Sequence, residues 1–401
     1  MNTFATNKPF VKPFLDQFIL TPSLLFFSDA EILQLDADLN QYEQLFLDPD
    51  IEKNLMSKNV LLASFAISKA ENSALTIQEA REVYRDLLKN EEYSFIAKKL
   101  IAKKKLTRKD YEKLEFFNIA KTFRNFQLVR INEITPEFIK DLHRQLTQGL
   151  DVFQDYLPKF DVYRSGNWRN TDTIRVGSYQ PAPCAEIEAG VKELIIWIKE
   201  HQTLTSVGIF HTAFYALHPF NNGNKRVSRI LEHFLLRCLS INKKNLYSTS
   251  YYYHKEKTRY YKYLLFSLER RNLNHFVSFF QEALVLSILS VVKTSLEVKR
   301  QSFLDSKDAD EQIRLICKSL IKRHEIQFKY LLKSVGTNMA RQTFVTYLQQ
   351  AVDQGIISRR EEGKATFYSL NVSTQEEKTF HLMLNFIKTK LTFIPDEIKL
   401  A

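Results

Sequence analysis

The sequence predicts a mainly α-helical protein that ends in a small module of helices and a two-stranded hairpin. Only 9 Gly and 10 Pro occur in 401 residues, so long helical segments meet few breaks. Apolar runs at 207–217 and 230–239 flank a short polar turn, which is the pattern of one helix followed closely by another. Near the C-terminus, three helical segments precede two short β-type segments, and this order predicts a winged helix-turn-helix domain.

Composition limits the class of protein. A chain of this length can bury a large core and is expected to form two or three domains. The net charge of +11 favours acidic partners but does not decide between nucleic acid and protein. The three widely spaced cysteines predict buried thiols in a reducing compartment, without a disulfide framework or zinc site. With no leader sequence and no apolar run of about 18 residues, a cytoplasmic protein without a membrane span is expected.

The N-terminal region, residues 1–112, is predicted to be helical. After an extended arm punctuated by prolines, helices are expected at 28–46 and 51–70. Thr76 is expected to cap a third helix, because amide and acidic side chains follow in its first turn.

A lysine-rich stretch fills positions 89–114. Its apolar residues keep roughly helical spacing, so the lysines are expected to form the solvated face of a helix. A nucleic-acid patch is the alternative interpretation of the same charges. The basic residues concerned are Lys98, Lys99, Lys103, Lys104, Lys105, Arg108 and Lys109.

The central region, residues 113–300, is predicted to form one domain. Helices are expected at 116–128 and 136–150. Glycines and prolines then punctuate 151–184, where β-type alternation over 171–176 predicts a short hairpin. Further helices are expected at 186–199, around Tyr260 and at 274–298.

The most informative stretch is His218-Pro219-Phe220-Asn221-Asn222-Gly223-Asn224-Lys225-Arg226-Val227-Ser228-Arg229. Pro219 biases His218 away from the helical region, which places the imidazole at the exit of the first helix. Gly223 permits the backbone of a tight turn. The next helix opens with N–H groups that attract anions, and three basic side chains add positive charge there. A base beside such a turn predicts a site for a phosphate-bearing substrate.

This stretch resembles the signature of the Fic family, H-P-F-x-[D/E]-G-N-[G/K]-R-x-x-R. The resemblance implies a Fic-type helical bundle and the transfer of AMP from ATP to a hydroxyl side chain of a target protein. His218 would be the general base that deprotonates the incoming hydroxyl. ATP-binding residues implied by the family are Asn222, Gly223, Asn224, Lys225, Arg226 (β-phosphate) and Arg229 (γ-phosphate). Tyr260 and Tyr261 resemble the family's Y-Y-x-x-L helix beside the adenine, with an ordinary core role as the alternative.

The segment from Tyr163 to Pro183 resembles the family's G-x-[FY]-R…V-x-I-G…P-x-P pattern, with Arg169 in place. The resemblance implies a short β-hairpin flap that aligns the target protein by strand addition. An ordinary surface hairpin is the alternative interpretation. The flap residues implied are Thr173, Ile174, Arg175 and Val176.

Residues 67–76 resemble the inhibitory helix that some family members carry, with its S-S-x-I-E-G pattern. Ser68 and Glu71 match, while Asn72 replaces the glycine and Ile67 replaces a hydroxyl residue. The resemblance implies that Glu71 reaches Arg229 and blocks the γ-phosphate position. Without the signature downstream, a solvated carboxylate at a helix end would be the simpler interpretation of Glu71.

Two positions depart from the family pattern. Asn222 stands where the family carries the carboxylate that holds Mg²⁺, so the metal is expected to bind more weakly and to depend on the nucleotide. Lys225 resembles the Doc branch, whose members transfer the γ-phosphate. Because Arg229 and Glu71 belong together in the AMP-transferring branch, adenylylation ranks first and a Doc-like protein kinase second. A catalytically weak nucleotide-sensing regulator that acts through the winged helix is the third alternative.

Residues 311–401, after a linker at 305–310, are predicted to form the winged-helix domain. Its third helix, at 340–352, carries few basic side chains, and the tip of the wing carries two glutamates. DNA and protein partners are therefore about equally favoured for this domain. The sequence leaves open the target protein, the modified residue type and whether the chain forms a homodimer.

Overall fold

The computed structural model describes residues 6–47, 49–90, 92–125, 130–372 and 375–395, without the side chains of Glu71 and Thr337. The chain divides into two compact units. Unit 1 contains residues 1–34 and 54–284, and unit 2 contains residues 35–53 and 285–401. The predicted domain limits stay predictions, although α5 (Arg108–Asn125) runs across the limit at 112/113.

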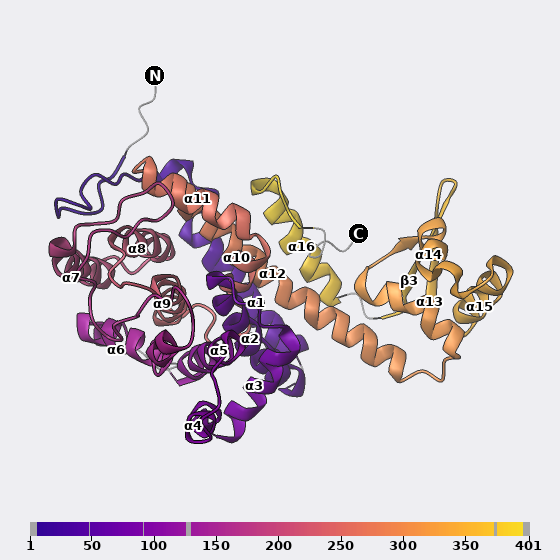
Figure 1. Ribbon diagram of the computed structural model, residues 1–401. Coiled ribbons are helices and arrows are strands. Elements are labelled where there is room, and N and C mark those ends of the chain that lie inside the picture. Colours follow the sequence, from indigo (N-terminus) through magenta and orange to yellow (C-terminus); the bar gives the residue numbers. More distant parts are fainter. Residues whose placement is uncertain (1–5, 48, 91, 126–129, 373–374, 396–401) are drawn as a thin grey trace. The chain divides into compact units, whose positions relative to one another are not determined.

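Unit 1 is built from helices, as the sequence predicts (Figure 1). Helices α1 (Asp29–Phe46), α2 (Pro49–Ser68) and α12 (Asn274–Asp305) each contribute residues to both units. The helices that belong wholly to unit 1 are α3 (Ile77–Lys89), α4 (Ser94–Ile101), α5, α6 (Pro136–Thr147), α7 (Cys184–Glu200), α8 (Leu204–Leu217), α9 (Asn224–Cys238), α10 (Thr249–Lys255) and α11 (Lys257–Glu269). Short 3₁₀ turns lie at Pro22–Leu24, Lys69–Glu71, Ile131–Glu133 and Leu150–Asp155.

Helices α8 and α9 form the centre of unit 1. All of α8 is buried except Thr205, because α7, α9 and α11 pack around it. Gly190 of α7 lies so close to α8 that a Cβ at this position would approach the Leu217 side chain to 2.5 Å. This dense packing holds the turn between α8 and α9 in a fixed place.

The helix starts near the N-terminus follow the predicted capping. Thr76 forms a complete capping box with Glu79, whose backbone N–H donates to the threonine hydroxyl while its carboxylate accepts from Thr76 N–H. Helix α3 then packs Val83 and Leu87 against Phe116 and Phe117 of α5. The apolar contact and the cap together fix the segment that follows α2.

The lysine-rich stretch is less helical than the sequence predicts. Helix α4 ends at Ile101, and Lys103 has a left-handed backbone with φ of 51°. Lys103, Lys104 and Lys105 are exposed in the connection that leads to α5, so they are solvated as expected but do not lie on a helix.

The predicted flap forms only a minimal hairpin. Val176 and Tyr179 make an isolated antiparallel bridge, and no strand extends over 171–176. The guanidinium of Arg169, 3 % exposed, donates instead to the carbonyl oxygens of Thr171 and Ala182, at 2.6 Å for Thr171. The alternation in the sequence therefore corresponds to an extended segment that the Arg169 side chain holds, because the described residues supply no neighbouring strand to form a ladder.

Unit 2 ends in a module of helices and a small sheet. Its elements are α13 (Glu311–Lys322), β1 (Ile326–Gln327), α14 (Phe328–Val335), α15 (Arg341–Asp353), β2 (Ile357–Glu362), β3 (Ala365–Leu370) and α16 (Gln375–Lys390), with a 3₁₀ turn at Gly336–Asn338. The strands form an antiparallel sheet in the order β1-β3-β2, with Ile357 opposite Leu370 and Ile326 opposite Tyr368. This arrangement is consistent with the predicted winged helix. Strand β1 and helix α16 were not predicted from the sequence.

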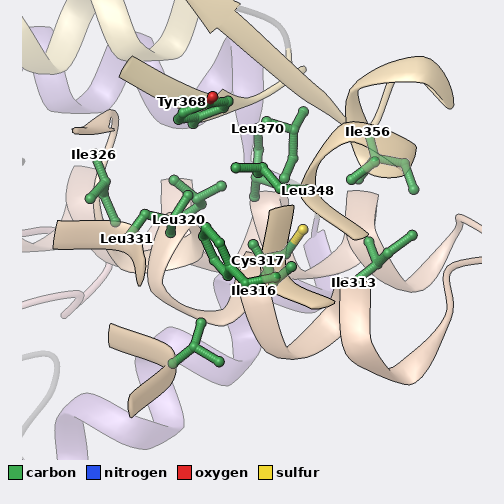
Figure 2. Close-up of a cluster of buried hydrophobic side chains, with 14 of the residues drawn as sticks. Ile313, Ile316, Cys317, Leu320, Ile326, Leu331, Leu348, Ile356, Tyr368 and Leu370 are labelled. Carbon is green, nitrogen blue, oxygen red and sulfur yellow. The ribbon is translucent and has the colours of Figure 1, made fainter. Parts of the chain in front are cut away.

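The core of this module gathers side chains from its helices and from β3 (Figure 2). Ile316 and Leu320 of α13 and Leu331 of α14 are fully buried, and Tyr368 and Leu370 of β3 cover them. Fully burying each such aliphatic side chain contributes about 1.5–3 kcal/mol. Three helices and a hairpin of this size therefore have a core of their own.

Two expectations from composition need correction. Helix α12 contains an 18-residue window of mean hydropathy 1.7, so the expectation that no apolar run of this length occurs is wrong. Some 89 % of that window is buried inside the structure, which is the environment of a core helix. The three cysteines are free thiols, but of these Cys317 alone is buried, while Cys184 and Cys238 are half-buried.

Candidate active site

Unit 1 contains a cavity of about 370 Å³ where α8 ends and α9 begins. Its wall comes from the signature turn, from α11 and from the extended segment at 175–177. A volume of this size falls within the range of roughly 300–1,000 Å³ that small-molecule sites occupy. The predicted site residues in the wall are Arg175, Val176, His218, Asn222, Gly223, Asn224, Lys225 and Tyr261. The predicted residues Thr173, Ile174, Arg226, Arg229 and Tyr260 are not among the lining residues.

His218 lies at the exit of α8, as Pro219 predicts. Its backbone is left-handed with φ of 48°, and its N–H donates to the carbonyl oxygen of Phe214 at 3.0 Å. The buried Arg169 donates from Nε to the His218 carbonyl oxygen at 2.8 Å, and from its backbone N–H to the Pro219 carbonyl oxygen at 2.8 Å. Arg169 therefore holds the strained backbone that presents the imidazole to the cavity.

The turn itself is held by the side chain of Asn224. Its Oδ1 accepts from the Phe220 N–H at 2.9 Å, and its Nδ2 donates to the Phe220 carbonyl oxygen at 2.7 Å. Gly223 has φ of 84°, a conformation that side-chain-bearing residues resist. The N-terminus of α9, with Gly223, Asn224 and Lys225 in the wall, thus faces the cavity and favours an anion there.

The first signature arginine, Arg226, forms an ion pair with a buried carboxylate of α5. Arg226 is fully buried, and its Nη1 lies 2.8 Å from Oε1 of Glu115, which is itself 1 % exposed on α5. Its Nη2 also donates to the Tyr163 hydroxyl at 3.1 Å. The role of Glu115 is not predictable from the sequence, because nothing in its local pattern distinguishes a buried partner from a solvated helix carboxylate.

The second signature arginine contacts the N-terminal helices. Arg229 is buried against the ring of Tyr260, whose centroid is 4.5 Å from the guanidinium carbon, and donates to the carbonyl oxygen of Ala66 at 3.2 Å. Tyr260 bonds further to the buried His211 at 3.1 Å. Tyr261 instead lines the cavity, 5.4 Å from the Lys225 ammonium. The tyrosine pair is thus split between core and cavity.

The candidate inhibitory segment lies against these residues. The backbone of Glu71 belongs to the 3₁₀ turn after α2, while its side chain lies outside the described part of the structure. The Tyr261 hydroxyl donates to the Ala70 carbonyl oxygen at 3.0 Å, and the Lys257 ammonium to Asn72 Oδ1 at 2.6 Å. The predicted Ser68 hydroxyl bonds back to the Phe65 carbonyl oxygen within its own helix. The residues around Glu71 are therefore docked on α9 and α11.

The site contains a further residue, His143, that was not predicted from the sequence. His143 on α6 is completely buried, and burial lowers the pKa of His143 to about 3. Its ring stacks on Phe220 with centroids 3.9 Å apart, and its Nε2 lies 3.0 Å from the Asn222 carbonyl oxygen. A single histidine on an amphipathic helix gives no sequence signal of such a contact.

The described residues of the cavity wall do not by themselves supply the ligands that Mg²⁺ prefers. None of the described residues in the cavity wall is a carboxylate, and no cluster of three His, Cys, Asp or Glu exists among the described residues. Oδ1 of Asn222 accepts the Gly223 N–H at 2.7 Å, so this oxygen is already engaged. Because Mg²⁺ prefers carboxylate and phosphate oxygens, the metal would depend on ligands from a nucleotide.

Structure comparison found solved proteins that align with this chain at low sequence identity. A Fic family protein from Desulfovibrio desulfuricans G20 is 20 % identical, with a TM-score of 0.48 over 92 % of this chain and 99 % of that one. Fic-1 from C. elegans is 16 % identical, with a TM-score of 0.48 over 66 % of this chain and 72 % of that one.

Sequence comparison places the similarity over the signature. A protein of Aquifex aeolicus (strain VF5) named "Probable protein adenylyltransferase aq_aa38" is 30 % identical over 84 residues, which are 20 % of this chain. The match spans about a quarter of that relative, 26 % of its length. Residues 133–236, from before α6 to near the end of α9, match the Fic/DOC family profile. This match contains His143, the extended segment and the whole signature turn, so residues 133–236 of the chain are similar to the Fic/DOC family.

Proposed function

We propose that the chain is a protein adenylyltransferase, which transfers AMP from ATP to a hydroxyl side chain of a target protein. The observation that carries the proposal is that His218, the N-terminus of α9 and the extended segment at 175–177 line one cavity. A general base, an anion site and a surface for a peptide are thereby combined. The relative from Aquifex aeolicus, named for this activity, supports the same class.

The reaction follows from the placement of these groups. The target hydroxyl oxygen attacks the α-phosphorus of ATP while its proton passes to the His218 imidazole. The new bond joins the hydroxyl oxygen to phosphorus, and the bond to the bridging oxygen breaks, which releases pyrophosphate. The dipole of α9 and the Lys225 ammonium stabilise the negative charge that moves to the leaving oxygens.

Autoinhibition by Glu71 is part of the proposal. Ala66, Ala70 and Asn72 each accept a hydrogen bond from α9 or α11, so the turn that contains Glu71 is held beside the signature. A carboxylate near Arg229 would compete with a γ-phosphate for the same guanidinium. Release of this segment would then free the γ-phosphate position and activate transfer.

Phosphate transfer is a second candidate, and one observation favours it. Lys225 lies in the cavity wall, whereas Arg226 and Arg229 are buried and bonded to Glu115 and Ala66. The signature cation that lines the cavity is thus the lysine of the Doc-like pattern, which suits a nucleotide bound in the reversed orientation. The third candidate, a nucleotide-sensing regulator, is favoured by the absence of a carboxylate among the described residues of the wall.

The regulator would need a partner for its winged helix. On the wing, Arg360 pairs with Glu325, at 2.9 and 2.7 Å, and also with Glu362, while Arg359 pairs with Glu361. Cations that already carry carboxylate partners add less to phosphate binding. A protein partner is therefore favoured over DNA for this module.

One experiment separates the first two candidates. The purified chain is incubated with ATP labelled at the α- or the γ-phosphate, in wild-type form and as Glu71→Gly. Adenylylation places only the α label on protein, together with the mass of an AMP group on the intact chain or a target. The γ label alone would establish phosphate transfer, and no label in either form, with retained ATP binding, would establish the regulator.

A further inference from the structure

The ring of His143 joins three parts of unit 1 that are distant in the sequence. It belongs to α6, its Nδ1 accepts the backbone N–H of Gly166 at 3.0 Å, and its Nε2 lies 3.0 Å from the Asn222 carbonyl oxygen. The ring also stacks on Phe220 with an angle of 4° between the planes. A Cβ added at Gly223 would meet Cδ2 and Nε2 of this imidazole at 3.3 Å. The imidazole of His143 therefore packs against the signature turn and holds it by a hydrogen bond.

These contacts define the tautomer of His143. Because Nδ1 accepts a backbone N–H, it carries no proton. The neutral ring must then carry its proton on Nε2, which donates to the Asn222 carbonyl oxygen. Full burial keeps the ring in this neutral form.

The bond to Asn222 determines the direction of the next peptide group. In a planar trans peptide, the C=O of Asn222 and the N–H of Gly223 point to opposite sides. With the carbonyl held against α6, the Gly223 N–H points to the Asn222 side chain, whose Oδ1 accepts it at 2.7 Å and which lines the cavity. An amide oxygen thus occupies the position that an anionic oxygen would take.

We infer that His143 is a positioning residue of the signature turn: by holding the Asn222 carbonyl oxygen, it keeps the Gly223 N–H directed at the cavity for a phosphate oxygen of the nucleotide. The inference rests on the proposed nucleotide transfer. When the nucleotide binds, a phosphate oxygen need only replace Asn222 Oδ1 as the acceptor of the Gly223 N–H. The peptide group between Asn222 and Gly223 does not have to flip. Without the hydrogen bond from His143, the peptide group between Asn222 and Gly223 would become ordered only on binding, and this ordering would lower the affinity for the nucleotide.

Two substitutions separate the hydrogen bond from the fold. His143→Gln keeps a donor near the position of Nε2, whereas His143→Asn keeps an acceptor for the Gly166 N–H but is too short to reach Asn222. ATP binding is measured by calorimetry on the full chain, with the melting temperature of each variant. His143→Asn is expected to bind ATP about tenfold more weakly, and His143→Gln close to the unaltered protein.

The outcomes distinguish this inference from the function on which it rests. If the unaltered chain binds ATP and His143→Asn binds it equally well, or both variants lose affinity alike, the positioning role is overturned while the proposed function stands. If the unaltered chain binds no ATP, the function fails and the inference with it. Imidazole ¹⁵N shifts give a readout independent of ATP: the Nε2–H tautomer is expected at neutral pH, and an Nδ1–H tautomer would overturn the assignment.

Discussion

The guanidinium of Arg229 in α9 donates a hydrogen bond to the carbonyl oxygen of Ala66 in α2 at 3.2 Å. Arg229 is 1 % exposed, and the rings of Tyr253 and Tyr260 lie on it with centroids 5.5 and 4.5 Å away. The last arginine of the signature is therefore hydrogen-bonded to α2, the helix that precedes Glu71. In the proposed function a γ-phosphate pairs with this same guanidinium, so the position of α2 is expected to affect activity.

Removing the carboxylate of Glu71 is expected to raise label transfer from α-labelled ATP. Glu71→Gly and Glu71→Gln both abolish the competing charge, and a coupling of this kind changes activity by about 5- to 150-fold. The exposed Glu82 of α3 provides the matched control, since Glu82→Gln removes a carboxylate from the same region without touching the site. Equal labelling in the Glu71 variants and the unaltered chain would refute the inhibitory role.

Replacing His218 by Ala is expected to abolish transfer while ATP binding persists. Loss of a general base lowers the rate by about 10²- to 10⁴-fold. The measurement is performed in the Glu71→Gly background, where labelling is strongest, with ATP affinity measured in parallel. His201→Ala, at an exposed histidine, is the control. If the His218→Ala protein still transfers the α label at the rate of this control, His218 is not the general base.

Replacing Asn222 by Asp is expected to raise both the rate and its dependence on Mg²⁺. The substitution supplies the charged oxygen that the wall lacks among its described residues, so Mg²⁺ should bind with a carboxylate and with phosphate oxygens. Transfer is measured over a series of Mg²⁺ concentrations and after chelation by EDTA. If the variant shows the same rate and the same half-saturating Mg²⁺ concentration as the unaltered chain, the amide of Asn222 does not weaken Mg²⁺ binding.

The pair formed by Arg226 and Glu115 is expected to support stability. Glu115→Ala leaves a buried guanidinium without its carboxylate and should lower the free energy of unfolding by about 3–5 kcal/mol. The double variant Glu115→Leu, Arg226→Met removes both charges and should cost clearly less. Urea unfolding followed by circular dichroism measures both. A single substitution that costs less than the double one contradicts the assignment of a buried pair.

Acid is expected to destabilise unit 1 through its buried histidines. Burial lowers the pKa of His143 and of His233 to about 3, below the value near 6.5 of an unfolded chain. Between these values the unfolded state binds more protons, so each residue's contribution is fully present above pH 6.5. It falls by about 1.4 kcal/mol per pH unit as the pH decreases towards 3. His233→Gln should flatten the fall in unfolding free energy between pH 6.5 and 4.5, and an unchanged slope would show that this histidine is not buried neutral.

The sequence by itself determined the features that depend on neighbours along the chain. The exit of α8 at His218, the glycine turn at Gly223 and the capping box at Thr76 follow from residues within four positions of one another. The same local patterns located most helices and the hairpin of β2 and β3. The signature string was enough to predict the similarity of this region to the Fic/DOC family.

Only the tertiary structure decided which side chains meet. It placed Arg226 on Glu115 and Arg229 on Ala66, although the family resemblance implies that both arginines bind phosphates. It also brought His143 to the Asn222 carbonyl, and left the extended segment without a strand partner. These contacts join residues far apart in the chain, and the selection among them depends on packing and on the cost of burying unpaired charge, which local spacing does not encode.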